Sequence, residues 1–164
     1  MNNEEIFVKV ARKNWDICLM QTSKAFESLN DDQMLTEIAP GKNRPVYLLG
    51  HLIAVNDAMI PQMRLGEGEH KQLRGAFLEK PDRAVEDVPS VQVLRKYWTD
   101  LNAKLAEHFD KLTPGQWLER HAIVSEEDFA KEPHRNRLAI LLSRTTHVGY
   151  HLGQLVLLSK QSEA

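Results

Sequence analysis

The chain has one cysteine, Cys18, so it cannot form an internal disulfide. The apolar neighbours of this residue predict a buried thiol with a structural role. Long apolar runs are also missing, because none approaches the roughly 20 residues that cross a bilayer. Residues 1–5 lack the basic and then apolar pattern of a signal peptide. These absences predict a cytoplasmic protein that does not enter membranes.

A strong net charge is absent as well. The formal net charge at pH 7 is -2, and the Lys and Arg residues are scattered rather than gathered in a basic patch. Nucleic acids and anionic membranes are bound through such patches, so we expect neither as a partner. The sequence has no internal repeat and no low-complexity segment. Its 42% of hydrophobic and 27% of charged residues are typical of a globular protein, and its length predicts a single domain over residues 1–164.

Apolar residues recur at helical spacing in four segments, and no alternation typical of a β-strand reaches a convincing length. The predicted fold is therefore all-α, a four-helix bundle. Asn43 is suited to cap the second helix, with Pro45 in its first turn, and Ser90 is suited to cap the third. The helices are expected over residues 4–29, 43–60, 90–112 and 136–160.

Two long connections separate these helices. Residues 66–88 carry Gly, Pro and charge with little periodicity, as expected for a crossover between the second and third helices, with helical fragments inside it. Residues 119–135 are polar and acidic, and they contain His121 and His134, which we interpret as surface histidines. Trp117, just before this segment, is predicted to pack its indole back on the bundle.

The fourth helix carries His147 and His151, four residues apart. Side chains at this spacing lie about one turn from each other on one face, so the two imidazoles can converge on one metal ion. Neutral ring nitrogens are good ligands for Zn, Ni, Cu or Fe. Arg144 and Gln154 share this face, and an apolar stripe adjoins it. We therefore expect this helix to be the most buried of the four.

A third histidine, His51, lies on the second helix among Leu and Ile residues. Facing helices of a bundle aim side chains at a common interior point, so His51 is expected to meet His147 and His151. Three imidazoles leave other coordination positions open, which is typical of catalytic rather than structural metal sites. Gln154 is expected to hold a ligand ring by a hydrogen bond or to contact substrate. The alternative is a polar core of three histidines, which would leave donors or acceptors without partners.

With His51 in Gly-His-Leu and with the fourth-helix motif at residues 146–155, Thr-His-Val-Gly-Tyr-His-Leu-Gly-Gln-Leu, the chain resembles the DinB-like (DinB/YfiT) superfamily of four-helix-bundle metalloproteins. The resemblance implies that His51, His147 and His151 are metal ligands. It implies a divalent metal, Zn or Ni first and Fe, Mn or Co as further candidates, a homodimer, and an up-down-down-up bundle with a long crossover after the second helix. Members are described as metal-dependent hydrolases, and some are transferases or isomerases that use a low-molecular-weight thiol such as mycothiol or bacillithiol.

The chain departs from many relatives beside its last candidate ligand, where Tyr150 and Leu152 stand in place of His and Arg. Leu152 cannot bind an anionic group, and Tyr150 is expected to pack. The sequence leaves two chemistries open for a small-molecule substrate: activation of a thiol for transfer, or of water for hydrolysis. It identifies no catalytic base. A metal-binding bundle without catalysis, acting as a sensor or interaction module, and an inert bundle with a histidine core are the rival interpretations.

Overall fold

The computed structural model describes residues 2–161 and the side chains of residues 2–158, so the ends of the predicted domain, residues 1 and 162–164, lie outside the described part. Within residues 2–161 the chain is helical, and its single β-bridge joins Arg120 to Asn136. The all-α class is thereby confirmed for these residues. The elements are α1 (Asn3–Glu27), α2 (Asp31–Met34), α3 (Pro45–Asp57), α4 (Met59–Gln62), η1 (Lys71–Leu73), α5 (Arg74–Phe77), α6 (Val91–Asp110), α7 (Pro114–Trp117), α8 (Glu126–Lys131) and α9 (Arg137–Gln161).

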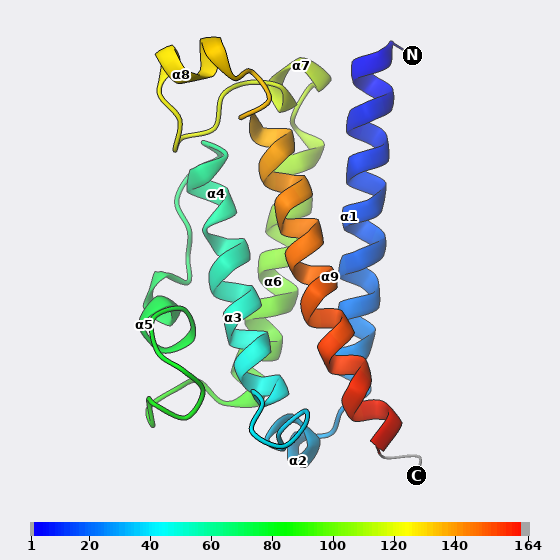
Figure 1. Cartoon of the computed structure of the whole chain (residues 1–164), viewed down its shortest axis with the longest axis vertical. Coiled ribbons are helices and arrows are strands. Elements are labelled where there is room, and N and C mark those ends of the chain that lie inside the picture. Colours follow the sequence, from blue (N-terminus) through cyan, green and yellow to red (C-terminus); the bar gives the residue numbers. More distant parts are fainter. Residues whose placement is uncertain (1, 162–164) are drawn as a thin grey trace.

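Four long helices, α1, α3, α6 and α9, lie side by side (Figure 1). In that view α1 and α9 run downward, whereas α3 and α6 run upward. Helix α1 packs chiefly on α9 and α3 chiefly on α6, while α3 also contacts α9. The short helices α7 and α8 lie at the upper end, and η1 and α5 lie beside α3 (Figure 1). No helix in the described part is long and apolar enough to cross a membrane.

The starts of the four long helices follow local capping chemistry, with α3 as the one exception. The Asn2 side chain accepts from the Glu5 backbone N–H, and the Glu5 carboxylate accepts from the Asn2 N–H, which begins α1 with a capping box. Helix α3 has Pro45 in its first turn as predicted, but its cap residue is Arg44 rather than Asn43. No side chain of the described residues caps α3, and the N–H of its cap residue Arg44 donates to the carboxylate of Asp82, a residue of the crossover.

The most buried of the long helices is α3, and the expectation that it would be α9 is wrong. Eleven of the thirteen residues of α3 are buried. Helix α9 instead exposes Leu142, Tyr150, Val156 and Leu157. The reason lies in the neighbours, because α3 is covered by α6, α9, α5 and η1, whereas α9 contacts chiefly α1.

The crossover after α4 is fixed to α3 by several contacts. The buried carboxylate of Asp57 accepts the backbone N–H groups of Glu69 at 2.8 Å and His70 at 3.1 Å. The ring of Phe77 packs over Gly50, where a Cβ atom would stand 2.3 Å from the ring. Hydrogen bonds and close packing therefore hold this connection against the helix that carries His51.

The upper end of the bundle is closed by Trp117. Its side chain is 1% exposed, and its ring centroid lies 5.1 Å from that of Phe109 on α6. This confirms that the indole packs on the bundle.

Candidate metal centre

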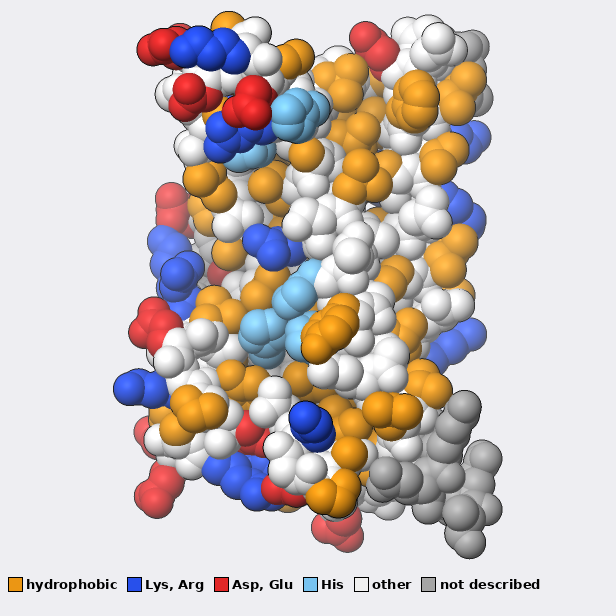
Figure 2. Space-filling model, in the orientation of Figure 1, with side chains coloured by type: hydrophobic (Ala, Val, Ile, Leu, Met, Phe, Trp, Pro, Cys, Tyr) orange, Lys and Arg blue, Asp and Glu red, His pale blue; other side chains and the backbone are white. Residues whose placement is uncertain are grey.

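Three histidine side chains meet where α3 packs on α9. His51 Nε2 lies 3.2 Å from His147 Nε2, and His151 Nε2 lies 3.1 Å from the same atom. All three ligand atoms lie within 4.8 Å of one another. Figure 2 shows a patch of histidine surface in the middle of this face, so the cluster reaches the exterior. The structure thus brings together the three residues that the sequence predicted.

The helices explain this convergence. His147 and His151 are one turn apart on α9, with ring centroids 4.6 Å apart and planes at 90°. His51 comes from α3, and its centroid lies 5.1 Å from that of His147 and 5.0 Å from that of His151. Helical spacing supplies the pair, and the packing of α3 on α9 supplies the third ring.

Two of the rings are oriented by acceptors behind them. His51 Nδ1 lies 2.9 Å from the carbonyl oxygen of Phe77, and His151 Nδ1 lies 2.7 Å from Gln154 Oε1. Both partners are oxygen acceptors, so each Nδ1 carries the proton and each Nε2 presents a lone pair to the common point. The role expected of Gln154 as a hydrogen-bond partner of a ligand ring matches this geometry.

The distances between the Nε2 atoms and the positions of the ring protons fit a bound cation. Metal–imidazole bonds of roughly 2.0–2.1 Å place neighbouring ligand nitrogens about 3 Å apart. Without a cation, two of the rings have no proton on Nε2, so His147 alone would have to donate to both. Its Nδ1 is buried and has no hydrogen-bond partner in the described part of the chain. A group that accepts three lone pairs satisfies the cluster better than hydrogen bonds among the rings do.

Burial favours the neutral form of two rings of the cluster, those of His147 and His151. The pKa of His147 falls from the ordinary 6.5 to about 4, chiefly through burial, and the charges of His151, His51 and Arg144 contribute to this fall in that order. Burial also lowers the pKa of His151, although the Gln154 hydrogen bond raises it. Neutral imidazole is the form that binds metals, so these two rings need lose no proton on binding at pH 7.

Aromatic rings flank the cluster. The Tyr47 ring is stacked on His51 at a centroid distance of 6.3 Å, and its hydroxyl donates to the Lys80 carbonyl. Tyr150 stands with its edge to His151 at 5.1 Å, and its oxygen lies 3.4 Å from Gln154 Nε2. Tyr150 is 64% exposed, so the expectation that it would pack is wrong. It instead stands at the rim of the site.

The other candidate residues lie apart from the cluster. His121 is buried, not at the surface as expected, and its Nδ1 accepts from the Ile123 N–H. His134 is exposed as expected. Cys18 is half-buried rather than buried as predicted; its thiol contacts the Thr145 carbonyl, and burial raises its pKa, which makes the reactive thiolate less available.

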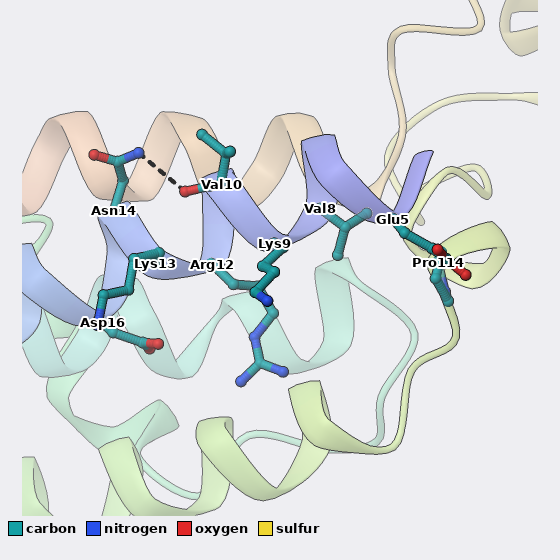
Figure 3. Close-up of a pocket in the computed structure, with 9 residues that line it drawn as sticks. All are labelled: Glu5, Val8, Lys9, Val10, Arg12, Lys13, Asn14, Asp16 and Pro114. Carbon is teal, nitrogen blue, oxygen red and sulfur yellow. Dashed lines mark hydrogen bonds between the residues drawn. The ribbon is translucent and has the colours of Figure 1, made fainter. Parts of the chain in front are cut away.

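A broad hollow of the described surface also lies away from the cluster. It is a groove of about 800 Å³ along α1 that ends at Pro114 of α7 (Figure 3). Its walls are formed by side chains such as Val8, Val10 and Arg12, with no histidine or cysteine among them. Its carboxylates, Glu5 and Asp16, do not belong to any group of three candidate metal ligands among the described residues.

Sequence reasoning missed two groups at the centre. The Phe77 carbonyl orients His51, but a backbone oxygen leaves no signature in a sequence. Arg144 was placed on the histidine face without a role, and its charge is close enough to lower the pKa of His147. Its position three residues before His147 was the available signal.

Comparisons with known proteins place the chain in a family. No curated protein matches it. A family model, that of the DinB superfamily, matches residues 14–155. The matched segment contains all three clustered histidines together with Phe77 and Gln154. The chain therefore belongs to the DinB superfamily.

Proposed function

We propose that this protein is a metal-dependent enzyme in which the Nε2 atoms of His51, His147 and His151 bind one divalent cation. The observation that carries the proposal is their convergence, with two tautomers fixed so that the lone pairs face one point. Zn and Ni are the first candidates, followed by Fe, Mn and Co, because imidazole suits borderline metals. No carboxylate belongs to the cluster in the described part of the chain, so a bound cation would keep its full double charge.

The residues of the chain prepare the site for chemistry on a small molecule. Gln154 and the Phe77 carbonyl hold two rings in place, and burial holds His147 and His151 neutral. The cluster reaches the surface, with the exposed Tyr150 at its rim, so a substrate can approach it from outside. When bound, a divalent cation acts as a Lewis acid that lowers the pKa of a coordinated water or thiol. The reaction is therefore thiol transfer, with a low-molecular-weight thiol as cosubstrate, or hydrolysis.

The family supports the wider description. We infer a single domain with the up-down-down-up order of a DinB-like bundle, in which residues 66–88 form the crossover. We place the protein in the cytoplasm, where a lone half-buried thiol is not required to pair.

A second copy of the chain is the partner that we propose. Nine of the twelve exposed large hydrophobic side chains in the described part lie on α1 and α9, which pack side by side. Exposed apolar surface of this kind marks interaction sites, and two-fold homodimers are the commonest assemblies. The nine side chains are those of Ile6, Phe7, Val10, Ile17, Met20, Leu142, Tyr150, Val156 and Leu157.

Sedimentation equilibrium of the wild type should give a dimer, and Phe7→Glu should give a monomer. Ile123→Glu, which changes an exposed side chain outside α1 and α9, should remain a dimer.

Metal analysis of protein purified without a histidine tag tests the proposal. We expect about one divalent metal per chain, and loss of that metal in His51→Ala, His147→Ala and His151→Ala. His134→Ala, which removes an exposed histidine outside the cluster, is the matched control and should keep the metal. Retention of metal by all three cluster variants would refute the site.

Activity then separates the chemistries. The metal-loaded protein is assayed with thiols plus small electrophiles, and with ester and amide substrates. Turnover in one panel that disappears in His147→Ala assigns the reaction class. A metal-loaded protein without turnover in either panel would contradict the enzyme and favour the sensor or interaction module.

A further inference from the structure

The guanidinium of Arg144 is close enough to the histidine cluster for its charge to act on His147, and no carboxylate of the described residues pairs with it. Arg144 precedes His147 by three residues on α9, so the two side chains share a face. It is half-buried, and its Nε is sealed from solvent with no hydrogen-bond partner in the described structure. Its one hydrogen bond in that part of the chain is a long one, 3.5 Å from Nη2 to Gln62 Oε1.

Other arginines show how unusual this is for the chain. In the described structure, every other arginine that is at least partly buried pairs with a carboxylate or donates a hydrogen bond to a backbone carbonyl. These partners are Asp110 for Arg12, Asp82 for Arg44, the Phe26 and Leu29 carbonyls for Arg95, the Val124 carbonyl for Arg120, Glu132 for Arg135, and the Met63 carbonyl for Arg137. Arg144 meets only the weak acceptor of an amide.

An unpaired charge in this position is costly to the folded protein. Removing a guanidinium from water without a partner is unfavourable, and burial accordingly lowers the pKa of Arg144. A methionine or leucine would fill the same space without this cost. We therefore expect the charge of Arg144 to serve a ligand-bound form of the protein, in which the ligand supplies a negatively charged group.

A cation at the histidine cluster would add positive charge near Arg144 and so favour binding of an anion. The clustered ligands are three histidines with no carboxylate, so they would leave a divalent cation uncompensated. Arg144 adds a further positive charge on the same face. Figure 2 shows Lys or Arg surface directly above the central histidine patch. A site with this charge selects negatively charged ligands.

We propose that Arg144 binds an anionic group of the substrate, a carboxylate or a phosphate, while the reacting group of that substrate faces the three histidines. This inference rests on the proposed metal-dependent function and names its substrate class. The guanidinium donates to the anion through its terminal nitrogens, since its Nε is sealed. Arg144 thereby positions the substrate.

The test compares a charged and a neutral thiol on cobalt-loaded protein. The probes are 3-mercaptopropionate and 3-mercaptopropan-1-ol, and the readout is the near-ultraviolet sulfur-to-cobalt charge-transfer band. Arg144→Met should weaken binding of the charged thiol by roughly tenfold or more, the factor that one charge-assisted hydrogen bond supplies. Binding of the neutral thiol should stay within about twofold, because it has no group for Arg144 to bind. Arg144→Lys should lie between wild type and Arg144→Met.

Arg12→Met is the matched control. Arg12 is also half-buried with a sealed Nε, but it lies in the α1 groove and pairs with Asp110. It should leave both thiol affinities unchanged. Equal weakening of both thiols by Arg144→Met, or weakening of neither, would overturn the proposal.

A metal-free arm keeps this inference separate from the proposed function. Inorganic phosphate and propionate are titrated into metal-free protein, and the rise in melting temperature is recorded. We expect stabilisation of wild type that Arg144→Met abolishes, and the stronger of the two anions identifies the class. Failure to load cobalt would contradict the metal site alone. Absence of anion binding in the metal-free wild type, together with unchanged thiol affinities in the cobalt-loaded Arg144→Met variant, would contradict the role of Arg144 alone.

Discussion

Gln154 offers the sharpest test of how the ligand rings are held. Its Oε1 accepts the Nδ1 proton of His151 at 2.7 Å, and His151 is only 8% exposed. In Gln154→Leu this N–H is left buried without an acceptor. The ring is then free to carry its proton on Nε2, and an Nε2 that carries a proton cannot bind a metal.

The expected loss of zinc affinity follows from this geometry. An unsatisfied buried donor costs about 1–3 kcal/mol, and removing the partner behind a ligating histidine typically weakens metal binding by about 10- to 100-fold. We expect a loss in this range, measured at pH 7.5 by competition with a chromophoric zinc chelator.

Two matched variants separate the acceptor from the bulk of the side chain. Gln154→Glu keeps an acceptor at the same reach and should bind zinc at least as tightly as wild type. Tyr150→Phe removes only the oxygen that lies 3.4 Å from Gln154 Nε2, so it should change affinity by less than about twofold. Zinc affinity in Gln154→Leu equal to that of wild type would refute the reasoning.

Three further predictions concern the support of the site and its charge. Gly50→Ala places a Cβ 2.3 Å from the Phe77 ring, so it should lower the free energy of unfolding in urea by about 1–3 kcal/mol. It should also weaken zinc binding, because the Phe77 carbonyl orients His51. Unchanged stability would show that the Phe77 ring moves aside without cost. Asp57→Ala leaves two backbone N–H groups unpaired, which should lower the free energy of unfolding by about 2 kcal/mol and speed amide hydrogen exchange in residues 66–78. Exchange in these residues as slow as in wild type would contradict this prediction. Because the pKa of His147 falls to about 4 in the folded state, the unfolded chain binds the extra proton below pH 6.5. Metal-free protein should therefore lose stability as the pH falls from 6.5 toward 4, and this slope should flatten in His147→Gln.

Local sequence patterns determined the long helices and the part of the site that lies on α9. The Ser90 cap of α6 and the spacing of apolar residues marked the helix limits, because capping and periodicity act within a few residues. The four-residue spacing of His147 and His151 fixed their common face for the same reason, and Gln154 follows one turn later.

Tertiary structure decided what depends on partners distant in sequence. His51 joins the cluster only because α3 packs on α9, and its ring is aimed by a backbone carbonyl 26 residues away. Burial of α3 rather than α9 depends on which helices cover each one. The lack of an anion at Arg144 is likewise a property of its surroundings. Periodicity reports which face of a helix is apolar, whereas packing across the chain decides what lies against that face.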